Sequence, residues 1–212
     1  MNTSEILQYV KGHPSGKVKI ALTDIDGILR GKYISVEKFL SVIESSTGFC
    51  DVIFGWDAND VAYDNATYTG WHTGYPDAPA RIDLSTFRKI PWENDVPFFL
   101  GELMANDKEP SPVCPRQLLK KVLNDASSQG YLPFFSQEFE WFNFAETPQS
   151  ASDKQFKNLT PLTPGMFGYS ILRSSLNNHF FADLFELLKN FNVPLEGLHT
   201  ETGPGTYEAA IT

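Results

Sequence analysis

A pair of strands joined by a tight turn is predicted by residues 195–211, LEGLHTETGPGTYEAAI. The turn lies at residues 202–205, where Gly-Pro-Gly favours backbone conformations that other residues resist. Such a turn can bring the carboxylates of Glu201 and Glu208 back toward one place, whereas an unconstrained separation of seven residues need not. His199 is a candidate further ligand or acid, although we favour a strand histidine with an ordinary hydrogen bond.

Two more glutamates lie on an earlier predicted strand, residues 131–144. A period of two puts Glu138 and Glu140 on one face of this strand and Phe139 with Trp141 on the other. The Cα atoms of the two glutamates are then about 7 Å apart. Two carboxylates that face one cavity repel, so each tends to take up a proton or to bind a cation. A solvated strand face is the alternative, because glutamate is mostly exposed.

Four glutamates are therefore candidate metal ligands: Glu138, Glu140, Glu201 and Glu208. Three or four convergent carboxylates select a hard divalent ion such as Mg²⁺ or Mn²⁺ over Zn²⁺. Spacing alone leaves their convergence a hypothesis.

The rest of the chain predicts a mixture of helices and strands. Apolar residues at helical spacing predict helices at residues 4–10, 36–43, 118–126 and 178–191, the third ending at Gly130. Alternating or short apolar runs predict strands at residues 17–22, 28–34, 51–56, 80–84 and 96–102. Residues 147–164 hold three prolines and are expected to form a long exposed loop, and the polar segment 106–115 is the predicted domain boundary. These elements indicate an α+β protein.

Composition excludes several classes of protein. The chain has 212 residues and a net charge of −9 at pH 7, which disfavours a nonspecific nucleic-acid binder and a polybasic membrane anchor. No apolar stretch approaches the roughly 20 residues of a membrane span, and no secretory signal is visible. The two cysteines, Cys50 and Cys114, lack metal or redox spacing and are expected to be ordinary thiols in a reducing compartment. We therefore expect a cytoplasmic protein.

At the glutamate segments the sequence resembles the glutamine synthetase family. Residues 137–142 resemble the family's E-x-E-F strand, and residues 199–208 resemble its H-x-E-x-x-P-G-Q-x-E segment. Residues 29–33 resemble the start of the family's N-terminal β-grasp domain. Residues 76–79 and 83–92 resemble the segment that closes that domain, especially in the branch acting on amines such as putrescine. The resemblance implies an N-terminal β-grasp domain over residues 1–108, followed by the incomplete beginning of a catalytic α+β domain over residues 109–212.

The resemblance also implies a function. Family members are ATP-dependent ligases that phosphorylate the γ-carboxylate of glutamate and let ammonia or an amine displace the phosphate. By position, Glu140, Glu201 and Glu208 correspond to ligands of the Mg²⁺ or Mn²⁺ ion on the glutamate side, and Glu138 to a ligand of the ion that bridges the phosphates of ATP, the co-substrate. Asp57 resembles an aspartate that helps bind the amine or ammonium across a subunit boundary in a homo-oligomeric ring. A loop aspartate that caps a turn is the alternative for Asp57.

Departures from the family pattern leave a second function open. Thr206 stands where the family usually has glutamine, and Thr200 where a second histidine often sits. Family chains are also longer, so we expect an N-terminal portion that is inactive alone and whose unpaired strand edges favour association. The alternative is a non-catalytic family member used for assembly or binding. An unrelated metal hydrolase is disfavoured, because the Asp/His clusters common in such sites are absent from the sequence.

Overall fold

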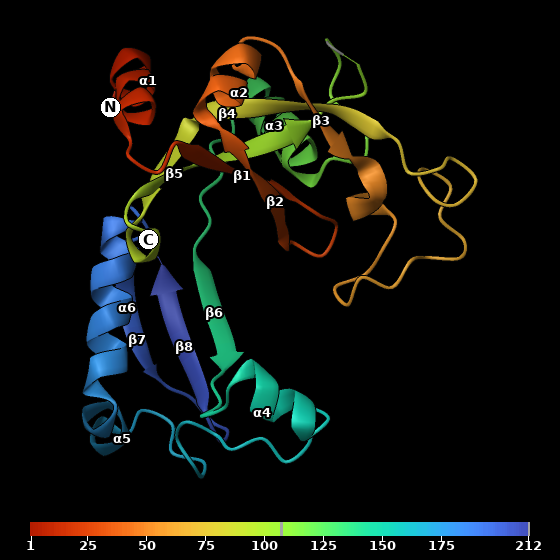
Figure 1. The fold of residues 1–212 in the computed structure, drawn as a ribbon. Helices are drawn as coiled ribbons and strands as arrows, with labels where there is room; N and C mark the ends of the chain where they lie inside the picture. Colours follow the sequence, from red (N-terminus) through yellow and green to blue (C-terminus); the bar gives the residue numbers. More distant parts are fainter. Residues whose placement is uncertain (107, 212) are drawn as a thin grey trace. The chain divides into compact units, whose positions relative to one another are not determined.

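The computed structural model describes residues 1–106 and 108–211, which fold into two compact units (Figure 1). Unit 1 is Met1–Pro133 and unit 2 is Phe134–Thr212. Both units contain helices and strands, so the predicted α+β class is confirmed. Within the described ranges, no helix is long and apolar enough to cross a membrane.

Unit 1 is built on a five-stranded mixed sheet with the strand order β2-β1-β5-β4-β3. β1 runs parallel to β5, and the other neighbouring strands are antiparallel. The strands are β1 Lys17–Thr23, β2 Leu29–Ser35, β3 Thr47–Cys50, β4 Asp77–Ile90 and β5 Val96–Leu103. The β1–β2 hairpin and β5 lie where the sequence predicts them, whereas β4 extends well beyond the predicted residues 80–84.

Two helices of unit 1 bury their apolar faces in a shared core. They are α1 Thr3–Gly12 and α2 Val36–Val42, capped at their N-termini by Asn2 and Ser35. The buried residues of this core come from both helices and from β1, β4 and β5: Ile6, Val10, Val18, Ile20, Phe39, Val42, Ile82 and Phe99. The sequence predicts both helices from the spacing of their apolar residues, among them Ile6, Val10 and Phe39 of this core.

The prediction of a strand at residues 51–56 is wrong. β3 ends at Cys50, and the following residues form a 3₁₀ helix, η1 Asp51–Phe54. Asp51 is buried, its carboxylate accepts a hydrogen bond from the Thr69 hydroxyl at 2.5 Å, and its backbone N–H donates to the carbonyl of Pro76 at 3.0 Å. These bonds, to residues distant along the chain, satisfy the polar groups of Asp51 without strand pairing. A short apolar run without alternation does not distinguish such a turn from a buried strand.

The third predicted helix of unit 1 is present as α3 Pro115–Ser128, and a shorter 3₁₀ helix, η2 Pro91–Glu93, precedes β5. Gly130 follows α3 with φ 83°, the left-handed conformation expected where a helix ends. The apolar side chains of α3 remain more than half exposed at Leu118, Leu119 and Val122. Burial of apolar surface therefore does not hold α3 to the sheet.

A network of charged side chains attaches α3 to the sheet instead. The Arg116 guanidinium donates to Asp83 at 2.5 Å and to Glu102 at 2.9 Å, and Lys120 also pairs with both carboxylates. Burial raises the pKa of Asp83, but hydrogen bonds from Ser85, Lys120 and Arg116 outweigh it and hold that pKa well below its usual range. The charged form of Asp83 thus stabilises the fold.

We expect this network to weaken in acid. A carboxylate whose pKa is lowered by folding stabilises the protein above its unfolded-state pKa, about 3.9, and loses that contribution as the pH falls toward its folded-state pKa. Asp83→Asn should therefore lower the urea midpoint of unfolding at pH 6, and the difference from the parent chain should shrink as the pH falls below about 4. A difference that does not change with pH would show that Asp83 does not act through its charge.

Unit 2 contains a three-stranded antiparallel sheet with the order β6-β8-β7. Its strands are β6 Gln137–Phe142, β7 Leu195–Thr200 and β8 Thr206–Ile211, and its helices are α4 Pro148–Asp153, α5 Ile171–Leu176 and α6 Asn178–Asn190. α6 runs along β7 and β8 (Figure 1). Tyr207 is fully buried, with ring centroids of Phe180 and Phe181 at 5.3 and 5.6 Å. α6 therefore covers one face of this sheet, and the predicted strand pair of residues 195–211 is confirmed.

Two sequence predictions in unit 2 are wrong in extent. The strand predicted at residues 131–144 is shortened to β6, because Gln137 pairs with Ile211 at the end of β8 and residues 131–136 have no strand beside them within the described chain. The loop predicted at residues 147–164 contains α4, in which Pro148 occupies the first turn, where a missing N–H costs nothing. α5 was not predicted.

Candidate metal-binding site

Three polar side chains form a row across the sheet of unit 2. Glu140 on β6 lies directly opposite Glu208 on β8, and Glu208 lies directly opposite His199 on β7. Directly opposed residues of antiparallel strands point to the same face with Cβ atoms about 4.5–5.5 Å apart. The neighbouring residue Tyr207 points to the other face, toward α6. Strand alternation thus separates a polar face from the buried one.

The turn between β7 and β8 adds Glu201 to this face. The backbone N–H of Glu201 donates to the carbonyl of Thr206 at 2.9 Å, which closes the turn. Gly203 and Gly205 have φ values of 142° and 77°, and a Cβ atom on Gly203 would lie 2.4 Å from Thr206 Oγ1. Glycine is therefore required where the sequence places it. Ligand atoms of His199, Glu201 and Glu208 all lie within 4.8 Å of one another.

The orientation of His199 leaves one ring nitrogen for a ligand. Its Nδ1 lies 3.2 Å from the backbone carbonyl of Thr200, which can only accept a hydrogen bond, so Nδ1 carries the proton in the neutral ring. Its Nε2 lies 3.7 Å from the nearer carboxylate oxygen of Glu208. Metal-binding histidines typically donate the N–H of the ring nitrogen that does not bind the metal to a backbone carbonyl, as Nδ1 does here. The ring of Tyr169 stacks on His199 with centroids 4.1 Å apart.

The chemistry of these residues fits a divalent cation. The Glu208 side chain is only 15% exposed, and within residues 1–106 and 108–211 the structure assigns its carboxylate no partner besides His199. A half-buried carboxylate without a hydrogen-bond donor, beside the carboxylate of Glu201, is costly unless a cation or proton joins it. Carboxylate oxygens suit Mg²⁺ or Mn²⁺, and the imidazole also admits transition metals.

The two glutamates of β6 lie beside this group. Glu140 shares the row with Glu208, and Glu138 lies opposite Ala210, one strand period further along. Both side chains are exposed, and their carboxylates are not among the ligand atoms that lie within 4.8 Å of one another. The structure therefore brings together Glu201 and Glu208 of the predicted ligands, adds His199, and places Glu138 and Glu140 on the same face.

Asp57 lies in unit 1, where it shapes a turn. Its Oδ1 accepts hydrogen bonds from the backbone N–H groups of Asn59 at 2.8 Å and Val61 at 3.0 Å. The Arg30 guanidinium donates to the Asp57 carbonyl at 3.2 Å and to the buried carboxylate of Asp24 at 2.8 Å. No sequence pattern indicates the contact between Arg30 and Asp57, because the two residues lie 27 positions apart along the chain.

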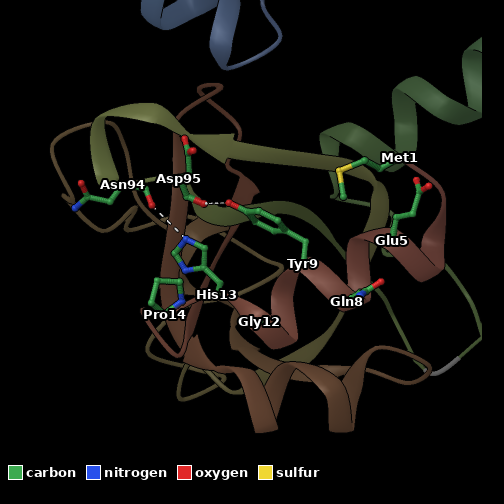
Figure 2. Close-up of a pocket in the computed structure, with 9 residues that line it drawn as sticks. All are labelled: Met1, Glu5, Gln8, Tyr9, Gly12, His13, Pro14, Asn94 and Asp95. Atoms are coloured by element: carbon green, nitrogen blue, oxygen red, sulfur yellow. Dashed lines mark hydrogen bonds between the residues drawn. The ribbon is translucent and has the colours of Figure 1, made fainter.

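A surface cavity of about 770 Å³ in unit 1 has polar groups of its own (Figure 2). The Tyr9 hydroxyl donates to the Asp95 carbonyl at 2.8 Å, and His13 Nε2 lies 3.2 Å from the Asn94 carbonyl. Both side chains thereby attach α1 to the turn before β5. The polar groups of this cavity thus have a structural role, because their hydrogen bonds hold the end of α1 against this turn.

Comparison with known proteins matches residues 112–212 to a family model described as glutamine synthetase, catalytic domain. The whole chain is 57% identical to a type-1 glutamine synthetase 2 from Dictyostelium discoideum, covering 40% of that protein. It is 30% identical over 99% of its length to a glutamate–isopropylamine ligase from a Pseudomonas species, covering 47% of that protein.

The fold shows the same likeness. A Plasmodium falciparum glutamine synthetase structure superposes over the full chain with a TM-score of 0.70 at 15% identity, and the chain covers 44% of it. The chain thus spans less than half the length of the curated relatives it matches, including the two described above. Its glutamate-bearing sheet, its catalytic-domain match and its identity to these relatives establish that the chain belongs to the glutamine synthetase family.

Proposed function

We propose that this chain is part of an ATP-dependent ligase that joins the γ-carboxylate of glutamate to ammonia or an amine through γ-glutamyl phosphate. The observation that carries the proposal is the convergence of His199, Glu201 and Glu208 on one face of a sheet that also presents Glu140. Relatives that are similar to this chain in sequence are named as a glutamine synthetase and a glutamate–isopropylamine ligase. The five-stranded mixed sheet of unit 1 supports a β-grasp domain before the catalytic one.

In this proposal the residues divide the work. Glu140, Glu201 and Glu208, with His199 beside them, would hold the Mg²⁺ or Mn²⁺ ion on the glutamate side, and Glu138 would help hold the ion on the ATP side. When bound there, a divalent ion would supply charge neutralisation and orientation for phosphoryl transfer. Asp57 helps bind the ammonium or amine substrate across a subunit boundary of a homo-oligomer. The Arg30 guanidinium holds the backbone of the Asp57 turn in place. We place the whole protein in the cytoplasm.

The experiment that tests this function joins two measurements. Calorimetric titration of the 212-residue chain with Mn²⁺ is expected to show saturable but weak binding, and phosphate release from ATP with glutamate and ammonia, isopropylamine or a diamine is expected to be absent. The substrate and phosphate clamps of the family are missing from the sequence, so the reactants are not positioned. Turnover by this chain alone would contradict the proposal that it is an inactive part.

The alternative function is a non-catalytic role in assembly or binding, which the threonines at positions 200 and 206 favour. Reading the coding DNA beyond residue 212 separates the two functions. An open frame that encodes a histidine-containing metal segment and arginine-rich substrate loops supports the ligase, and its product should release phosphate in the same assay. A stop codon there supports the assembly role.

A further inference from the structure

Thr200, which departs from the family pattern, makes several hydrogen bonds in the structure. It is the last residue of β7 and is 2% exposed. Its hydroxyl donates to the carbonyl of Phe167 at 2.8 Å and accepts from the N–H of Ser170 at 3.0 Å. Its own carbonyl accepts from the N–H of Tyr169 at 2.7 Å. One buried residue thus makes three hydrogen bonds to a single turn, residues 167–170.

This turn carries the aromatic ring that covers His199. The rings of Tyr169 and His199 are nearly parallel, at 20°, with centroids 4.1 Å apart. Tyr169 is 70% exposed, so packing around it does not fix its position. Its φ of 57° is an unfavourable left-handed value for a residue with a side chain, and the surrounding bonds must hold it there.

We infer that Thr200 is a positioning residue that, through the turn of residues 167–170, holds Tyr169 against His199 and so fixes the imidazole in the cation site. The binding of a cation by His199 rests on the proposed function. The contacts from Thr200 to the turn and from Tyr169 to His199 do not. The hydroxyl takes part as both donor and acceptor, which serine can reproduce and valine cannot. Removing it leaves a carbonyl and an N–H of the turn without partners, which favours rearrangement of the turn.

Unit 2 provides a matched control for this hydroxyl. Thr206, the first residue of β8, is also buried, at 4% exposure. Its Oγ1 has no hydrogen-bond partner among the described residues. Thr200→Val and Thr206→Val therefore make the same chemical change in the same sheet, but only the first removes hydrogen bonds to the turn.

The first measurement needs no metal. The chain has four histidines, so a carbon–proton NMR spectrum of the histidine-labelled protein gives four ring Hε1 signals, and His199→Gln assigns the one of interest. Stacking under Tyr169 shifts the His199 signal upfield. Tyr169→Leu should remove that shift, and Thr200→Val should move the signal to nearly the same position. Thr200→Ser and Thr206→Val should leave it unchanged, as should the signals of His13 and His72 in every variant.

The second measurement is the affinity for Mn²⁺. Residues that orient a metal-binding histidine typically change affinity by 10–100-fold when substituted, so Thr200→Val and Tyr169→Leu should each weaken binding about tenfold. Thr200→Ser and Thr206→Val should bind like the parent chain. If Thr200→Val does not fold, Tyr169→Leu, which changes an exposed side chain, and Thr200→Ser still test the positioning role.

The outcomes separate the inference from the proposed function. A His199 signal that stays in place in Thr200→Val, or that does not respond to Tyr169→Leu, overturns the inference. The expected NMR shifts in a chain that does not bind Mn²⁺ support the positioning role and contradict the cation site. Equal losses of Mn²⁺ affinity in Thr200→Val and Thr206→Val would assign the effect to sheet stability and also overturn the inference.

Discussion

Glu208→Gln is expected to lower the affinity of the chain for Mn²⁺ by more than about 100-fold, beyond the range typical of residues that only support a ligand. Glu208 is the central member of the row of Glu140, Glu208 and His199, and it lies within reach of Glu201. Glutamine preserves the shape of the side chain but removes the charge that a hard cation requires. Loss of the electron paramagnetic resonance signal of free Mn²⁺ measures the bound fraction.

Two controls distinguish a loss of Mn²⁺ binding from a loss of stability. Glu196→Gln is the matched control, because Glu196 is an exposed glutamate on β7 outside the cation group, and it should bind Mn²⁺ like the parent chain. Without metal, Glu208→Gln should melt no lower than the parent, because the substitution removes repulsion between two neighbouring carboxylates. A Glu208→Gln chain that binds Mn²⁺ as tightly as the parent would contradict the site.

Phe99→Ala is expected to destabilise unit 1 by about 3–5 kcal/mol, the range for truncating a fully buried phenylalanine. Phe99 lies on β5 and is 0% exposed. Its ring stacks on Phe39 of α2 at 4.9 Å and lies 5.4 Å from Phe87 of β4. The substitution therefore leaves a cavity where the sheet meets α2.

Hydrogen exchange with urea, read peptide by peptide, measures this effect in unit 1 separately from unit 2. Leu29→Ala is the control, because Leu29 on β2 is 54% exposed and its truncation should cost less than about 1 kcal/mol. Equal losses of stability in the two variants would show that the core does not centre on Phe99.

Periodic and capped segments could be predicted from the sequence because local patterns determine them. The α1 and α2 helices, the β1–β2 hairpin and the β7–β8 pair are of this kind. The failures depend on distant partners. Polar and apolar residues do not alternate regularly over residues 131–136, and within the described chain this segment has no neighbouring strand to pair with. Asp51 lies in a 3₁₀ helix instead of a strand and bonds to Thr69 and Pro76. Burial and pairing partners outweigh local preference in such segments.

The candidate site, too, could be predicted from the sequence only in part. The turn at residues 202–205 made the convergence of Glu201 and Glu208 a hypothesis, and the structure brings the two carboxylates together. The register that this turn sets also places His199 opposite Glu208. The sequence made His199 a candidate ligand, although an ordinary hydrogen bond was the favoured interpretation. The Thr200 hydroxyl bonds to Phe167 and Ser170, which lie 33 and 30 positions earlier along the chain. No sequence pattern marked these contacts.

The most direct test of the cation site is a crystal of this chain soaked in Mn²⁺ and measured near the manganese absorption edge. We expect an anomalous peak among the side chains of Glu201, Glu208 and His199, on the face of the sheet that Glu140 shares, and no such peak in crystals of Glu208→Gln. Well-ordered carboxylates without a peak between them, at Mn²⁺ concentrations that saturate the titration in solution, would contradict this expectation.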